Sequence, residues 1–257
     1  MIGRLVWYGD FPLERRLELL KAAGYDYIEI SLDYPFPEEV DVNELKELLE
    51  SFEMSVAFHS PLDVFIAQPR DEVFEASMKI IERCLNFVSN FETAYYNFHI
   101  TYFCPTREFE RVRKKVLENG RKACEFIVER AESSGFDVAL EYDRNFDESF
   151  LVENLKICLD IGHFALANKK NYLSELENFV KKFERRILVA HIHDCNLEKR
   201  IDHISLNNGE LDLRKILAKV KANFYTIETF WRDSDRNELR DVDVISDYEI
   251  LKSLLEK

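Results

Sequence analysis

The chain has 257 residues, of which 46% are hydrophobic and 33% are charged, a balance typical of a globular protein with a sizeable core. No apolar run reaches the roughly 18 residues that a membrane-spanning helix needs, so we expect no membrane partner. The formal net charge of −14 disfavours a nucleic-acid partner, because a negative protein repels phosphate backbones.

Strand-like apolar segments alternate with helix-like amphipathic segments along the chain. In chain order, we expect strands at residues 4–8, 25–30, 54–58, 94–100, 137–141, 155–160, 187–191 and 224–228. We expect helices at residues 13–23, 42–52, 72–91, 108–133, 172–183, 213–220 and 248–255. The connection that follows residues 137–141 has no predicted structure.

This alternation predicts a parallel sheet with right-handed crossovers, and the number of strands favours a closed barrel. No linker or low-complexity segment interrupts the sequence. We therefore expect residues 1–257 to form one α/β domain, a single (β/α)8 TIM barrel, with a doubly wound open sheet as the alternative.

The N-terminus and the cysteines favour a cytoplasmic protein. The first residues lack the apolar stretch and cleavage site of a signal peptide. The five cysteines are widely spaced and contain no Cys-x-x-Cys pair, so we expect reduced, mostly buried thiols rather than disulfides or a thiolate zinc site.

Histidine and acidic residues end six successive predicted strands. These residues are His59, His99, Glu141, Asp160, His191 and Glu228. None of the six histidines of the chain lies in a predicted helix; His163 follows Asp160 by three residues, and His193 shares a strand face with His191. A barrel gathers the C-terminal ends of its strands at one mouth, where such enzymes place their chemistry.

Buried carboxylates repel one another unless they are paired, protonated or bound to a metal. Each residue alone has a simpler explanation, a hydrogen-bonded loop histidine or a capping carboxylate, but coincidence explains six successive strands poorly. Mixed imidazole and carboxylate ligands suit Zn²⁺, Mn²⁺ or Co²⁺ better than Ca²⁺ or Mg²⁺. We therefore predict a divalent-metal site. Because His193 shares a strand face with His191, one of these two histidines could orient the other or contact substrate rather than bind the metal.

In these segments the chain resembles the xylose-isomerase-like TIM-barrel superfamily, which contains sugar and sugar-phosphate isomerases and epimerases, hydroxypyruvate isomerase and endonuclease IV. The resemblance extends from Gly24 to Glu228. It rests on the segments His59-Ser60-Pro61, Phe98-His99, Leu140-Glu141, Leu159-Asp160-Ile161-Gly162-His163, His191-Ile192-His193-Asp194, His203 through Gly209, and Ile227-Glu228.

The resemblance implies a metal site formed by Glu141, Asp160, His191 and Glu228. It further implies that Glu141 and Glu228 move a substrate proton through a metal-stabilised enediolate. His163 and His203 would contact substrate oxygens, and His59 would act similarly at the mouth.

The resemblance to endonuclease IV implies a second arrangement with three zinc ions. His59, His99 and Glu141 would hold one ion, and the four residues of the shared metal site would hold a second. His163 and His203 would hold the third, together with an aspartate two residues before His203. Here that position is Ile201, and the acid is Asp202. The loop at residues 31–39 is acidic and has no arginine to probe a duplex, which also disfavours DNA repair.

The sequence therefore favours a metal-dependent isomerase or epimerase of a small sugar, sugar phosphate or hydroxy-keto acid, with Zn or Mn, or else Co, as cofactor. An AP endonuclease and a non-catalytic metal or ligand binder are the alternatives. Homo-oligomers are common among such enzymes, although no residue demonstrates one. Four basic residues in predicted mouth-side loops could bind a phosphate, although a solvated charge explains each one more simply: Arg144, Lys199, Arg200 and Arg232.

Overall fold

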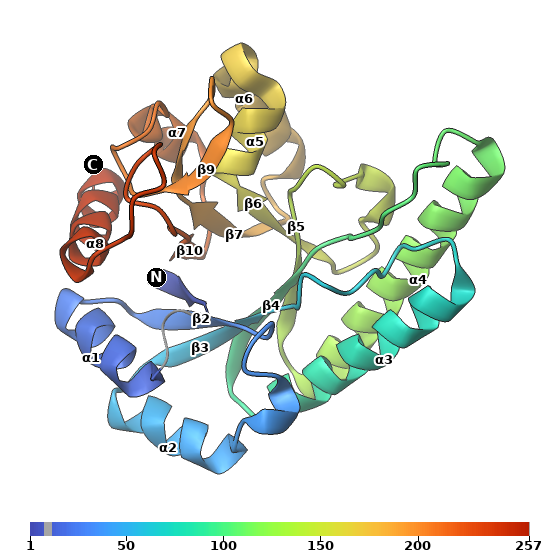
Figure 1. The fold of residues 1–257 in the computed structure, drawn as a ribbon, viewed down its shortest axis with the longest axis horizontal. Helices are drawn as coiled ribbons and strands as arrows, with labels where there is room; N and C mark the ends of the chain where they lie inside the picture. The colour runs from blue at the N-terminus through green and yellow to red at the C-terminus, as the bar shows by residue number, and fades with distance from the viewer. Residues whose placement is uncertain (8–11, 257) are drawn as a thin grey trace. The chain divides into compact units, whose positions relative to one another are not determined.

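The computed structural model describes residues 1–7 and 12–256. Eight parallel strands close a barrel in the order β1-β10-β7-β6-β5-β4-β3-β2, with helices between them (Figure 1). The barrel strands are β1 (Ile2–Val6), β2 (Tyr27–Ser31), β3 (Ser55–His59), β4 (Thr93–Phe98), β5 (Asp137–Glu141), β6 (Lys156–Asp160), β7 (Ile187–Ile192) and β10 (Phe224–Ile227). The predicted (β/α)8 TIM barrel is confirmed.

Most of the helices lie where the apolar periodicity predicts them. They are α1 (Leu13–Ala23), α2 (Val42–Ser51), α3 (Asp71–Val88), α4 (Glu110–Ser134), α5 (Ile161–Asn168), α6 (Tyr172–Phe183), α7 (Leu213–Lys219) and α8 (Asp241–Leu255), with short 3-10 turns η2 (Pro37–Glu39), η3 (Glu148–Phe150) and η4 (Lys169–Asn171). None of the described helices is long and apolar enough to cross a membrane.

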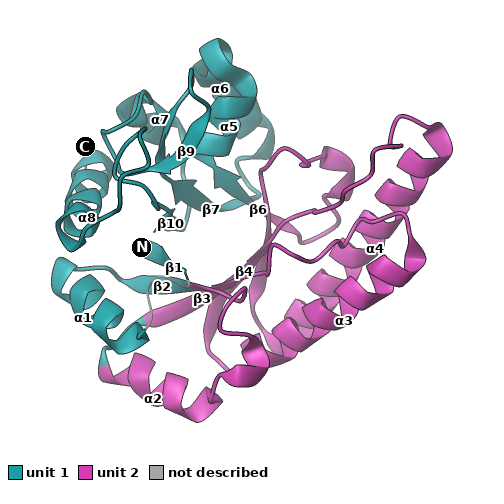
Figure 2. Ribbon diagram, viewed as in Figure 1, with its two compact units in different colours: residues 1–29, 52–54, 158–257 teal, residues 30–51, 55–157 magenta. Residues whose placement is uncertain are grey.

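The chain divides into two compact units, which Figure 2 colours teal and magenta. Unit 1 comprises residues 1–29, 52–54 and 158–257, and unit 2 comprises residues 30–51 and 55–157. In unit 1, Thr226 of β10 pairs with His191 of β7. In unit 2, His59 of β3 pairs with Asn97 of β4. The parallel registers thus place polar side chains of neighbouring strands side by side within each unit.

The sequence predicted that no histidine lies in a helix, and this prediction is wrong for His163. Helix α5 begins directly after Asp160, whose carboxylate caps it by accepting a hydrogen bond from the backbone N–H of His163 at 2.6 Å. The helix is apolar on most sides and is largely buried, so it lacks the polar face that reveals a helix in sequence.

Two further elements differ from the expectation. Helix α8 begins at Asp241 rather than at residue 248, because its first turn alternates acidic and apolar residues and resembles a strand in sequence. A short antiparallel hairpin outside the barrel, β8 (Asp194–Asn196) and β9 (Ile201–Ile204), carries His203. The first strand is shifted toward the N-terminus, and Tyr8, which we placed in it, lies outside the described residues.

A buried polar network in unit 1 anchors the segments that follow His203 and Glu228. The carboxylate of Asp247 on α8 accepts hydrogen bonds from the hydroxyl of Ser205, from the N–H of Leu206 and from the hydroxyl of Thr229, at 2.7–2.8 Å. Arg4 of β1 donates to the hydroxyl and the carbonyl of Thr229 at 3.0 and 2.9 Å. Arg4 is 3% exposed and Asp247 is fully buried, so each charge depends on this network.

We expect Asp247→Ala to lower the free energy of unfolding by about 3 kcal/mol, because three buried donors lose their acceptor and the buried Arg4 loses a negative charge that interacts with it. Urea unfolding followed by circular dichroism measures the loss. Asp241→Ala on the same helix is the control, since its ion pairs with arginines on α1 are at the surface and long, at 3.9–4.0 Å. Equal losses in the two variants would contradict the network's importance.

Candidate functional site

Three ligand-type side chains meet at the ends of neighbouring strands in unit 2. His59 ends β3, His99 follows β4, and Glu141 ends β5. The two Nε2 atoms lie 3.2 Å apart and face the same Glu141 carboxylate oxygen, at 3.4 Å from His59 and 3.5 Å from His99. All three side chains are buried. Two imidazole nitrogens and a carboxylate oxygen thus converge on one point, as in a metal site.

The surrounding hydrogen bonds prepare this cluster for a metal. The Nδ1 atom of His59 lies 2.8 Å from the carbonyl oxygen of Ser60, so Nδ1 carries the proton and Nε2 presents its lone pair. The Nδ1 atom of His99 lies 3.3 Å from a carboxylate oxygen of Asp143, which favours the same tautomer. Partners of this kind orient ligating histidines in metalloproteins.

A second set of ligand-type residues centres on His191 in unit 1. Its Nε2 atom lies 3.1 Å from Oε2 of Glu29 on β2, and its Nδ1 atom lies 2.7 Å from Oε2 of Glu228. Glu29 also accepts a hydrogen bond from Thr226 at 3.0 Å. Glu29 therefore fixes the imidazole from one side, so that Nδ1 points to Glu228.

Asp160 contacts both His193 and the first turn of helix α5. His193 lies with Nε2 at 3.0 Å from both carboxylate oxygens of Asp160, while its Nδ1 accepts the backbone N–H of His203 at 2.9 Å. The Nδ1 atom also lies 3.1 Å from the carbonyl oxygen of Asp194, so these backbone contacts hold the ring with Nε2 facing Asp160. A β-carbon at Gly162 would overlap the His193 ring, so glycine is required there for this close approach.

His203 completes the unit 1 set from the hairpin. Its ring stacks between those of His193 and Phe230, with centroids 4.3 and 4.5 Å away. Its Nε2 atom lies 3.4 Å from Glu228, and its Nδ1 atom lies 3.2 Å from Asp202. The backbone of His203 has φ of +54°, a strained left-handed conformation that proteins retain mainly at functional positions.

Asp202 reaches both of the histidines that the resemblance to endonuclease IV associates with a third metal, His163 and His203. Its carboxylate lies 3.5 Å from Nε2 of His163 and 3.2 Å from Nδ1 of His203. The adjacent acid therefore makes the contacts expected of an acid two residues before His203, where this chain has Ile201. Although the acid lies one position later in the sequence, its carboxylate still reaches both histidines.

Charge pairing shifts the pKa values in unit 1. Burial acts to raise the pKa of Glu228, but the neighbouring His191 and His203 hold it well below its ordinary value. Burial acts to lower the pKa of His203, but Glu228, Asp202 and Asp160 together raise it to about 10. The pKa of Asp202 is held low despite burial by its hydrogen bonds to His163 and His203. Imidazolium charge thus compensates the buried carboxylates.

The donor sets fit a divalent transition metal. In unit 1, Asp160, His191 and Glu228 each bring a ligand atom within 4.8 Å of the others, and so do Asp160, His163, His193 and His203. In unit 2, His59, His99 and Glu141 do the same. Buried nitrogen and carboxylate oxygen donors are the ligands that Zn²⁺, Mn²⁺ and Co²⁺ prefer.

Comparison with known proteins agrees with this architecture. A model of the xylose isomerase-like TIM barrel family matches residues 17–248. The chain belongs to this family. The resemblance predicted from the sequence is thereby confirmed.

The individual proteins that the chain resembles are distant in sequence. The probable endonuclease 4 of Aquifex aeolicus (strain VF5) is 22% identical, and the match covers 76% of this chain and 76% of the relative. A D-tagatose 3-epimerase-like protein has a similar structure, with a TM-score of 0.77 and 22% identity, covering 99% of this chain and 97% of its own. D-psicose 3-epimerase from Clostridium cellulolyticum H10, solved with D-tagatose, has a TM-score of 0.77, 13% identity and 99% coverage of both chains. At these identities the solved structures show the shared fold.

The sequence did not indicate Glu29, Asn97 or Asp143 as part of the site. Asn97 donates a short hydrogen bond to Glu141, and Asp143 faces His99. Glu29 could have been suspected, because it is a carboxylate within an otherwise apolar strand core, whereas Asp143 depends on how its loop folds back.

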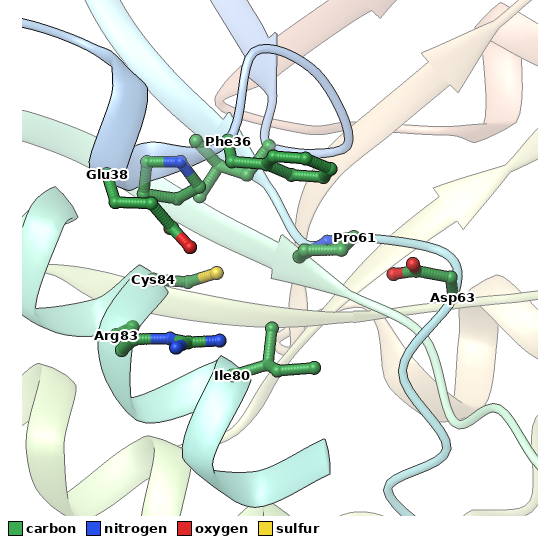
Figure 3. Close-up of a pocket in the computed structure, with 9 residues that line it drawn as sticks. Phe36, Glu38, Pro61, Asp63, Ile80, Arg83 and Cys84 are labelled. Atoms are coloured by element: carbon green, nitrogen blue, oxygen red, sulfur yellow. The ribbon is translucent and has the colours of Figure 1, made fainter. Parts of the chain in front are cut away.

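A separate small cavity of about 200 Å³ lies in unit 2 beside α3, and Figure 3 shows its lining. Arg83, Glu38 and Asp63 supply its charged groups, and Cys84 supplies a thiol. Burial raises the pKa of Cys84 to about 12, so this thiol stays protonated and is a poor nucleophile. None of the residues that we predicted for the site lines this cavity.

Proposed function

We propose that the protein is a divalent-metal-dependent isomerase or epimerase of a small sugar, sugar phosphate or hydroxy-keto acid. The observation that carries the proposal is the convergence of buried Asp160, His191 and Glu228. Together with Glu141 at the end of β5, these residues would hold the metal, Zn or Mn, with Co as an alternative. The fold, which is also that of the 3-epimerases with similar structures, supports this class of reaction.

The proposed chemistry is a proton transfer at a carbon beside a carbonyl group. A bound cation would supply the positive charge that stabilises an enediolate. Glu228 would remove the proton from one face of the substrate carbon, and Glu141 would return or remove it at the opposite face. His203, stacked on Phe230 and exposed by 13% at its side chain, would donate a hydrogen bond to a substrate oxygen. His163, also partly exposed, would act in the same way, and His59 and His99 would lie beside Glu141.

Metal content tests the proposed ligands directly. Protein purified without added metal or chelator should contain about one Zn, Mn or Co per chain by elemental analysis. Asp160→Asn should reduce the content at least tenfold, whereas the exposed Asp235→Asn should leave it unchanged. Full metal content in Asp160→Asn, or a metal-free wild type that binds none on addition, would contradict the site.

Turnover tests the proton-transfer role. Across a panel of ketoses, ketose phosphates and hydroxy-keto acids, Glu228→Gln should lower kcat by about 10²- to 10⁴-fold because the amide cannot accept the proton. Circular dichroism should show an unchanged fold, and Glu198→Gln on the exposed hairpin turn should retain activity. Retained activity in Glu228→Gln would refute the acid–base assignment, and tight metal binding without any wild-type turnover would favour a binding protein instead.

A second candidate function is an AP endonuclease, and the cluster of His59, His99 and Glu141 favours it. The two histidines of this trio belong to a different ligand group from Asp160, His191 and Glu228, so more than one ion could be bound. The endonuclease 4 relative supports the same alternative. A metal cluster could activate water for attack on a phosphodiester.

The nuclease alternative predicts two to three zinc ions per chain and nicking of a duplex that contains an abasic site. Chelation should abolish nicking, and His99→Ala should remove part of the zinc and most of the nicking. Denaturing gel electrophoresis of a labelled duplex measures the product. Absence of nicking by zinc-loaded protein would exclude this function.

A further inference from the structure

The loops after β4 and β5 enclose a second, larger concavity in unit 2. Its volume is about 620 Å³, and its lining consists of Tyr102, Phe103, Cys104, Pro105, Arg107, Glu108, Arg144 and Asn145. An adjoining hollow of about 250 Å³ shares three of these residues and adds Arg113 and Val116. The two hollows therefore bring three arginines and one carboxylate together in a chain whose net charge is −14.

The arginines of this concavity differ from Lys199 and Arg232, two other basic residues that we associated with the mouth. Lys199 forms an ion pair with Asp235 at 2.8 Å, and Arg232 with Asp233 at 3.4 Å. Within residues 1–7 and 12–256, neither Arg107 nor Arg144 has an ion pair or a side-chain hydrogen bond. Their guanidinium groups are thus available to an anion from outside the chain.

The wall of the concavity is fixed by a two-point clamp. The side-chain amide of Gln68 donates to the carbonyl of Phe103 and accepts from its N–H, both at 3.1 Å. Asn119 of α4 in turn donates to the carbonyl of Gln68 at 2.7 Å. The loop after β4 is therefore held in place before any ligand arrives, which reduces the entropy lost on binding.

The opposite wall is connected to the metal-type cluster. Asp143 contacts Nδ1 of His99 and also accepts the N–H of Asn145 at 2.6 Å. Arg144 lies between these two residues in sequence and lines the concavity. A ligand that binds Arg144 would thus lie beside the loop that supports His99.

We propose that this concavity binds the phosphate group of a sugar phosphate. Guanidinium groups match phosphate oxygens in paired hydrogen bonds, and two of them offset the two negative charges of a phosphate monoester. An uncharged sugar has no group that needs two cations. The inference rests on the proposed function for the rest of the substrate, and it narrows the substrate class to phosphorylated sugars.

Calorimetric titration of the metal-containing protein tests the inference with two matched pairs, D-ribose with D-ribose 5-phosphate and D-fructose with D-fructose 6-phosphate. We expect the phosphorylated member of at least one pair to bind at least tenfold more tightly. Arg144→Ala and Arg107→Ala should each remove most of this preference without changing the affinity for the unphosphorylated sugar. Arg185→Ala, an exposed arginine before β7, is the control and should retain the preference.

The inference is overturned if neither pair shows a preference, or if the preference survives both substitutions. It is also overturned if the two variants instead lose affinity for a duplex with an abasic site, because the concavity then binds a nucleic-acid backbone. The readout is binding rather than turnover. A phosphate preference in a protein that converts no sugar would therefore defeat the proposed function while the phosphate site stands.

Discussion

The pairing of buried carboxylates with imidazoles is the constraint on which the candidate site depends. A carboxylate such as Asp160 or Glu228, fully or almost fully shielded from water, is stable only beside compensating charge or hydrogen-bond donors. His191 lies between two acids, Glu29 and Glu228, and each of its nitrogens faces one of them. The strand registers, the glycine beside His193 and the strained backbone of His203 all serve to keep these pairs in contact.

The sequence predicted the barrel well because buried parallel strands are short apolar runs and their covering helices are amphipathic. It failed where this contrast is absent. Helix α5 is apolar on most sides, and the first turn of α8 alternates in the manner of a strand. The ligand-type residues at strand ends were visible because a polar residue ends each apolar run. Glu29 and Asp143 were missed because their roles depend on neighbours that only the folded chain provides.

The two units contribute different kinds of chemistry. Unit 1 supplies a dense network in which Asp160, Glu228 and three surrounding histidines compensate one another. Unit 2 supplies a second buried set, in which two imidazoles face Glu141, and two loops whose arginines have no ion pair within the described residues. Under the proposed function, one barrel scaffold would carry both the reacting centre and the residues that recognise the substrate, and changes in such loops allow one fold to host different reactions.

Gln68 is the only glutamine of the chain, and it ties the loop after β3 to the loop after β4 through both atoms of its amide. Loops of a barrel are commonly treated as modules that can be exchanged one at a time. Here an insertion or deletion in either loop would break the clamp and release the other. New specificities on this scaffold, whether evolved or engineered, would therefore arise more readily by replacing the two loops together than by altering one of them.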